Sequence, residues 1–157
     1  MTISAPAPAP VSETGGTTTW RDPKAFVEPG VWERQIKLLV RDHPFDVVMA
    51  ERLFGQAVAY LITAMEKFGQ HLEIGCGELV DTAVHAFILD TVNYRRFCHK
   101  YFDGKFLEHV PEIDRKYDGS VERTARVIEA NGFKVDWPLW EADFAKCTPC
   151  YPGSDCH

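Results

Sequence analysis

The sequence predicts an all-α protein, a small helical bundle with a disordered N-terminal arm and a cysteine-rich C-terminal tail. Apolar residues recur every three or four positions in successive segments, and glycine and proline separate these segments. No segment alternates polar and apolar residues for long enough to predict a strand. With 157 residues, 45% of them hydrophobic, the chain is long enough for one domain with its own core.

Residues 1–19 are expected to form the disordered arm. Ala-Pro alternation at 5–10 favours extended conformations, and the Gly/Thr stretch that follows favours flexibility. This start has neither the basic region nor the apolar run of a signal peptide, so a cytoplasmic location is expected. Thiols stay reduced there, and clustered cysteines more often bind metal or perform redox chemistry than form structural disulfides.

The helical domain is expected to span residues 20–146 and to begin with two helices. In the segment 31–42 apolar residues have helical spacing, and His43-Pro44 should end the helix because a residue before proline avoids the α region. A longer helix is expected within 44–70. Its apolar residues are too dense for a single face, which predicts burial on more than one side, and Gly69 occupies the expected C-terminal cap position.

A second long helix is predicted from about Glu78 to Tyr101. Acidic residues occur in its first turns and basic residues in its last turns, as the helix dipole favours. The basic cluster at 95–100 is therefore interpreted as compensation of the dipole in preference to a phosphate site. After a loop over 105–119, a helix is expected to start with Ser120 as its N-cap and to end at Asn131-Gly132.

A short last helix is expected from about Pro138 to Lys146, anchored by Trp137 and Trp140. The formal net charge of −6 gives no electrostatic case for nucleic acid. No apolar run approaches the roughly 18 residues of a membrane-spanning helix, so no membrane partner is expected.

Asp81 and His85 are the first candidates for chemistry. Four residues apart in a helix, they share one face, so the carboxylate could orient the imidazole or both could bind one metal ion. The alternative is a solvated first-turn acid beside a hydrogen-bonded core histidine. Cys98 cannot join His85 if the helix is continuous, because thirteen residues span roughly 20 Å; Cys98 is then a small core residue.

The order of residues around this helix resembles the core of the glycine-rich domain-containing protein-like family over about residues 31–111. The residues that carry the resemblance are Asp81, His85, Leu89, Thr91, Tyr94, Cys98, Gly104, Phe106, His109 and Pro111. The chain departs from the family pattern at Val84, where tryptophan is usual, and at Phe87, where a second histidine is usual. Glu108 stands beside His109 where another histidine is common.

The resemblance implies a helical fold and no settled activity. It also implies that the loop after Gly104 folds back and brings His109 towards His85. Asp81, His85 and His109 would then form a two-histidine, one-carboxylate set, a common ligand type for iron, zinc or manganese. Tyr94 and Thr91 would line a pocket beside it. Asp81, His85, Tyr94 and His109 are thus the candidate catalytic residues.

The C-terminal tail, residues 147–157, holds three of the five cysteines. Cys147 and Cys150 have the C-x-x-C spacing that lets two thiolates bind one ion, and Cys156 and His157 follow. A zinc site in the tail is one interpretation, with His157, Cys76, Cys98 or His71 as candidates for the fourth ligand. A disulfide or reactive thiol pair, a tail without metal, and a peptide modified by a protein partner are the others.

Two functions therefore stay open from the sequence. The first is a helical protein that binds a transition metal, zinc or iron, as a metal-dependent enzyme or accessory component with a small-molecule substrate. The second is a non-enzymatic interaction module whose tail binds structural zinc or is modified by a partner. An open coordination position would distinguish them, because structural zinc sites are closed by four protein ligands.

Overall fold

The computed structural model describes residues 16–111, 113–114 and 118–144, and this part of the chain is all-helical. The predicted fold class is therefore confirmed for these residues, whereas the tail cysteines lie outside them. The elements are η1 (Pro23–Phe26), α1 (Pro29–Asp42), α2 (Val47–Glu66), α3 (Glu78–Leu89), α4 (Thr91–Tyr101), α5 (Ser120–Ala130) and α6 (Trp137–Phe144). The described residues contain no strand, only one isolated bridge between Arg21 and Phe133.

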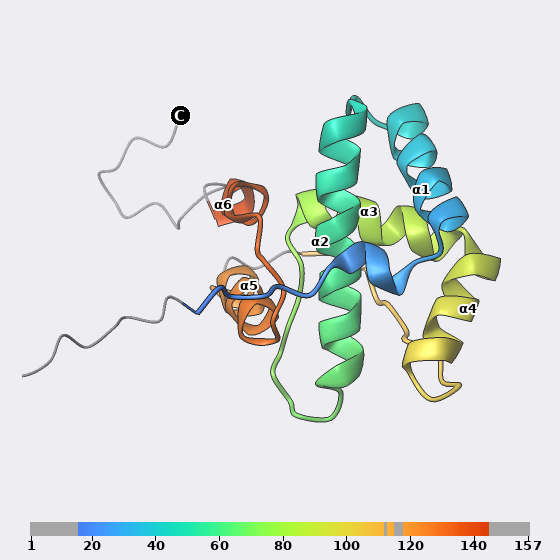
Figure 1. Ribbon diagram of the computed structural model, residues 1–157. Helices are drawn as coiled ribbons and strands as arrows, with labels where there is room; N and C mark the ends of the chain where they lie inside the picture. Colours follow the sequence, from blue (N-terminus) through green and yellow to red (C-terminus); the bar gives the residue numbers. More distant parts are fainter. Residues whose placement is uncertain (1–15, 112, 115–117, 145–157) are drawn as a thin grey trace, which may run out of the picture.

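Helix α2 is the centre of the bundle. It stands upright in Figure 1 with α1 and α4 on one side, α5 and α6 on the other, and α3 crossing it. Asp46 accepts a hydrogen bond from the Met49 amide and caps its N-terminus. Leu53 and Ile62 point about 180° apart around the helix and both are buried, as the dense apolar pattern predicted. Gly69, with φ 87°, follows shortly after its C-terminus.

By length and composition, α2 is also the one helix among the described residues that could cross a membrane. In the folded protein, 61% of its most apolar 18-residue stretch is buried. The core helix of a globular protein satisfies the same criterion, so this feature is weak support for a membrane span.

The prediction of one continuous helix from Glu78 to Tyr101 is wrong, because α3 and α4 are separate helices that meet at Asp90. Asp90 has ψ 68°, outside the helical region. Its carboxylate accepts hydrogen bonds of 2.9 Å from Arg34, Gln35 and Asn93, so α1 holds the break in place. The boundary between α3 and α4 thus depends on the contact of Asp90 with α1, and the local sequence does not reveal this contact.

Ser120 is not the N-cap of α5. Gly119 takes that position with φ 81°, and Ser120 is the first helical residue. The Asp118 carboxylate accepts the Ser120 amide at 3.0 Å and so satisfies one free N–H of the first turn. At the other end, Asn131 and Gly132 terminate the helix as predicted, with Gly132 at φ 89°.

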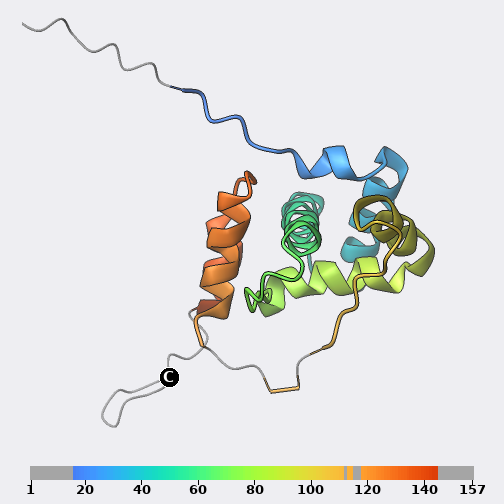
Figure 2. The same cartoon turned by 90° about the horizontal axis from the view of Figure 1, so that it is seen from below.

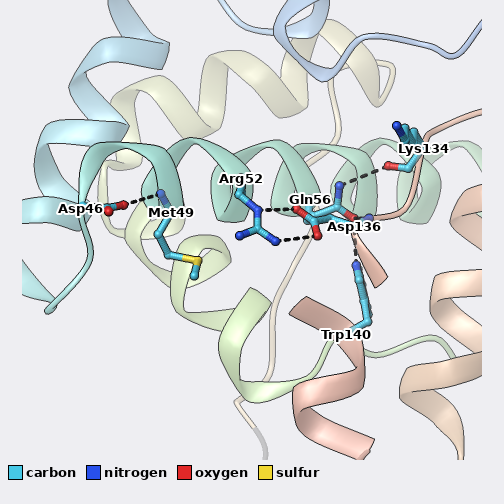
Figure 3. A network of polar contacts seen from close by, with 7 residues as sticks. All are labelled: Asp46, Met49, Arg52, Gln56, Lys134, Asp136 and Trp140. Atoms are coloured by element: carbon cyan, nitrogen blue, oxygen red, sulfur yellow. Dashed lines mark hydrogen bonds and ion pairs between the residues drawn. The ribbon is translucent and has the colours of Figure 1, made fainter. Parts of the chain in front are cut away.

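A polar network joins α2 to the segment that enters α6 (Figure 3). Gln56 accepts hydrogen bonds from the Trp140 indole at 2.8 Å and the Asp136 amide at 3.1 Å, and donates to the Lys134 carbonyl at 3.2 Å. Arg52 pairs with the Asp136 carboxylate through two bonds. Trp140 is fully buried, which confirms it as an anchor of the last helix.

Candidate metal centre

Helix α3 supplies two of the three groups in the candidate site. Asp81 lies in its first turn and His85 one turn later, so both side chains lie on one face. The Asp81 side chain is only 8% exposed, whereas that of His85 is 42% exposed. Asp81 is thus no solvated first-turn acid, because its carboxylate is buried beside an imidazole that solvent can reach.

The third group, His109, comes from the segment that follows α4. This segment runs back across α3 (Figure 2). The Tyr94 hydroxyl donates a hydrogen bond of 2.6 Å to the Leu107 carbonyl, and the Tyr94 and Phe106 rings meet edge to face at 5.3 Å. Tyr94 therefore fixes the backbone two residues before His109.

Three ligand atoms converge where this segment meets α3. The Nε2 atoms of His85 and His109 are 2.8 Å apart. Asp81 Oδ2 lies 3.5 Å from His85 Nε2, and Asp81 Oδ1 lies 3.4 Å from His109 Nε2. One ligand atom from each residue can be chosen so that all three lie within 4.8 Å of one another, the spacing of a metal-binding group.

These separations match what one bound ion requires. Two atoms each about 2.1 Å from an ion lie about 3.0 Å apart at a right angle and about 3.4 Å apart at the tetrahedral angle. The 2.8 Å between the imidazoles also suits a hydrogen bond in which one Nε2–H donates to the other Nε2. The geometry alone thus fits both an ion and a hydrogen-bonded histidine pair.

The N-terminus of α3 is held in place by contacts from α6 and α5. Gly77 is its N-cap, and the Asp143 carboxylate from α6 accepts the Leu79 amide at 3.2 Å. The Thr124 hydroxyl from α5 accepts the Gly75 amide at 2.9 Å. The backbone that carries Asp81 is therefore bound to two other helices.

Cys76 belongs to this site, whereas from the sequence it was considered only as a candidate fourth ligand of a zinc site in the tail. Its buried thiol lies 3.4 Å from Asp81 Oδ1 and donates to it, so Cys76 helps to orient the carboxylate. The spacing of five residues between Cys76 and Asp81 was a signal for this contact, but the two residues were not connected from the sequence.

Two cavities adjoin the three residues. One of about 200 Å³ is lined by Asp81 and His109 together with Tyr60, Cys76 and Glu108. Another of about 380 Å³ shares Tyr60, Glu108 and His109 with it, and adds Tyr94 and a more apolar wall. Space for a small molecule therefore lies beside the candidate ligands.

Tyr94 lines the larger cavity, as expected, but Thr91 lines neither and is exposed at the start of α4. Burial raises the pKa of Tyr94 well above its ordinary value, and neighbouring Cys98 and Tyr60 raise it further. The hydroxyl therefore stays protonated and serves as the donor to Leu107. This contact gives Tyr94 a positioning role towards His109.

Comparison with known proteins finds no matching family model, no matching curated sequence and no matching solved structure. The resemblance to the glycine-rich domain-containing protein-like family therefore stays a prediction. The site must be judged on its own geometry.

The other cysteines considered from the sequence add no described ligand to this group. Cys98 is buried in the core, as predicted from the sequence. Cys147, Cys150 and Cys156 lie outside the described residues. Asp81, His85 and His109 are thus the predicted ligands that the structure brings together.

Proposed function

We propose that this protein binds one divalent transition-metal ion, zinc or iron, through Asp81, His85 and His109. The observation that carries the proposal is the convergence of two Nε2 atoms and a buried carboxylate, with separations of 2.8, 3.4 and 3.5 Å. The contacts among the ligands join α3 to a separate segment of the chain.

The donor set favours a transition metal over magnesium or calcium. Those two ions prefer oxygen ligands, whereas imidazole suits zinc, iron, copper and nickel. Two histidines with one carboxylate are the ligand set of many mononuclear iron sites and of several zinc sites. Asp81 also carries the negative charge that offsets part of the charge of a divalent ion.

The arrangement supports an open site. The described residues provide three ligands, whereas structural zinc is usually closed by four. His85 is partly exposed, and the cavity of about 200 Å³ reaches Asp81 and His109. A water molecule or a small substrate can therefore approach the ion, which suits a metal-dependent enzyme or an accessory component of one.

A second candidate function rests on the tail, which holds three of the five cysteines within eleven residues. In it the helical body is an interaction module, and Cys147, Cys150 and Cys156 bind structural zinc or are modified by a protein partner. The expected cytoplasmic location and the absence of nucleic-acid and membrane partners also stay predictions.

The two functions are distinguished by measuring the number of metal ions bound per chain in a variant whose tail cannot bind metal. The starting variant carries Cys147→Ser, Cys150→Ser and Cys156→Ser. After chelation and loading with Co²⁺, this variant should retain about one ion per chain, with visible absorption from a protein-bound site. Elemental analysis and absorption spectroscopy give the two readouts.

Histidine variants in this background assign the ligands. His85→Ala and His109→Ala should each lose the bound ion while circular dichroism shows intact helices. His99→Ala, which removes an exposed histidine from α4, is the matched control and should keep the ion. A triple serine variant without stoichiometric metal would reject the proposed site and leave the tail as the metal-binding candidate.

A further inference from the structure

A cavity of about 390 Å³ lies between η1, the start of α1 and helix α4, and the metal centre does not account for it. Phe87 lines it from α3, two positions after His85. Residues two apart on a helix point about 200° apart. This cavity and the metal centre therefore lie on different sides of α3 and can be tested separately.

Three cationic side chains surround the cavity. Arg96 and Lys100 come from adjacent turns of α4, and Lys24 comes from η1, more than seventy residues earlier in the chain. Glu28 is the only carboxylate residue among its lining residues. In a chain with a formal net charge of −6, this local excess of positive charge is a distinctive feature.

No carboxylate in the described part of the chain forms an ion pair with these cations. Within the described residues no ion pair involves Lys24, Arg96 or Lys100, whereas Arg21, Arg34, Arg41, Arg52 and Arg126 all pair with carboxylates. Arg96 also lies in the middle of α4, whereas the basic residues of the last turn are His99 and Lys100. Compensation of the helix dipole, the interpretation from sequence, therefore does not explain Arg96.

Aromatic side chains form much of the remaining wall. The Tyr101 ring meets the Phe26 ring at 5.4 Å and the Phe97 ring at 5.2 Å, both edge to face. All three rings line the cavity. A planar ring would find apolar and aromatic surface here, with cationic groups nearby for an attached anion.

We propose that this cavity, which we call the basic aromatic pocket, binds a small aromatic anion. The ligand has one ring system and one phosphate or carboxylate group. The ring packs against Phe26, Phe97 and Tyr101, and the anion pairs with Lys24, Arg96 and Lys100. The volume lies within the range of small-molecule pockets, and charge-assisted hydrogen bonds to Arg96 give the anion its orientation.

The test is a calorimetric titration of the full chain with each of three probes. Adenosine monophosphate and 2-naphthoate combine a ring with a phosphate and with a carboxylate, whereas inorganic phosphate has no ring. At least one of the two aromatic probes should bind at one saturable site, more tightly than inorganic phosphate. The probe that binds more tightly identifies the phosphate or the carboxylate class.

Neighbouring arginines provide the matched variants. Arg96→Ala should weaken binding of the aromatic anion by roughly tenfold, because charge-assisted bonds are lost. Arg95→Ala removes the same charge from the next residue of α4, which does not line the pocket, and should change binding less than twofold. Both residues are exposed, so thermal melting should show that both variants fold.

Any of three results would overturn the proposal. The first is the absence of saturable binding of both aromatic probes at millimolar concentration. The second is inorganic phosphate that binds as tightly as they do. The third is equal weakening of probe binding by Arg95→Ala and Arg96→Ala. His109→Ala should leave probe binding unchanged, which keeps this test independent of the metal centre.

Discussion

The Nε2 atoms of His85 and His109 lie 2.8 Å apart, although 24 residues separate the two histidines in the chain. One side chain belongs to α3 and the other to the segment that returns after α4. An ion bound between them would therefore link two parts of the fold, and its effect should appear in the stability of the whole domain.

Metal binding should raise the melting temperature. A ligand present at 100 times its dissociation constant stabilises the folded state by about 2.7 kcal/mol, which corresponds to roughly 5–10 °C for a domain of this size. Zn²⁺ added to metal-free protein with the three tail cysteines replaced by serine should produce such a shift in differential scanning calorimetry. His109→Ala should melt at the same temperature with and without Zn²⁺, and an equal shift in this variant would place the ion elsewhere.

Tyr94→Phe should weaken metal binding without removing a ligand. The variant loses the 2.6 Å bond to the Leu107 carbonyl, at a cost of about 1 kcal/mol, and allows His109 to move. We expect a several-fold weaker Zn²⁺ affinity in a competition titration with a chromophoric chelator. Tyr101→Phe removes a hydroxyl from the same helix and should keep the original affinity; equal loss in both variants would contradict the positioning role.

Gly77→Ala should destabilise the domain, because space at this N-cap is already occupied. A Cβ atom there would lie 2.6 Å from Cγ and 2.7 Å from Cβ of the buried Asp143 side chain. Relief requires a shift of α3 against α6, at a cost of roughly 1–3 kcal/mol. Urea unfolding measures this cost. Gly75→Ala is the control, because its Cβ meets no atom within 4 Å.

The helical fold was predictable because most boundaries depend on local residues. His43 before Pro44 and the Asn131-Gly132 pair end their helices where expected. The break at Asp90 was missed because it depends on Arg34 and Gln35 of α1, about 55 residues away. Local sequence carries no record of such a tertiary contact.

The site was predictable in part for the same reason. The helical spacing of Asp81 and His85 shows their common face, but His109 entered through a family resemblance and not through geometry. Cys76 was considered only as a ligand for the tail, and the contact of Asp143 with the start of α3 was missed because it depends on how distant segments approach in space. Burial of Asp81, which distinguishes a ligand from a solvated acid, is also a tertiary property.

Glu66 should make stability depend on pH. Its carboxylate accepts hydrogen bonds from Arg21 at 2.7 Å and from Asn131 at 3.0 Å. These bonds lower the pKa of Glu66 below its ordinary value of 4.5, and the bond from Arg21 has the largest effect. The folded state thus gains stability from the ionised form above pH 4.5, and loses it as the pH falls through the lowered pKa. The gain is below about 1 kcal/mol, because both side chains of the ion pair are partly exposed.

Melting curves of Glu66→Gln test this dependence. The variant should melt below the wild type at pH 7, and the difference should shrink in acid as the wild-type carboxylate becomes protonated. Glu51→Gln, at an exposed position of α2, should change the melting temperature little at either pH. A difference for Glu66→Gln that stays constant in acid would contradict the electrostatic origin.

Gln56 should contribute more to stability than the ion pair beside it. Gln56→Leu leaves the Trp140 indole and the Asp136 amide without the acceptor shown in Figure 3, and an unsatisfied buried donor costs about 1–3 kcal/mol. Arg52→Ala removes the neighbouring ion pair to Asp136, whose arginine is 40% exposed, and should cost less than about 1 kcal/mol. Urea unfolding of both variants gives the comparison. If Arg52→Ala is the more damaging change, the surface ion pair and not the buried amide holds α6 against α2.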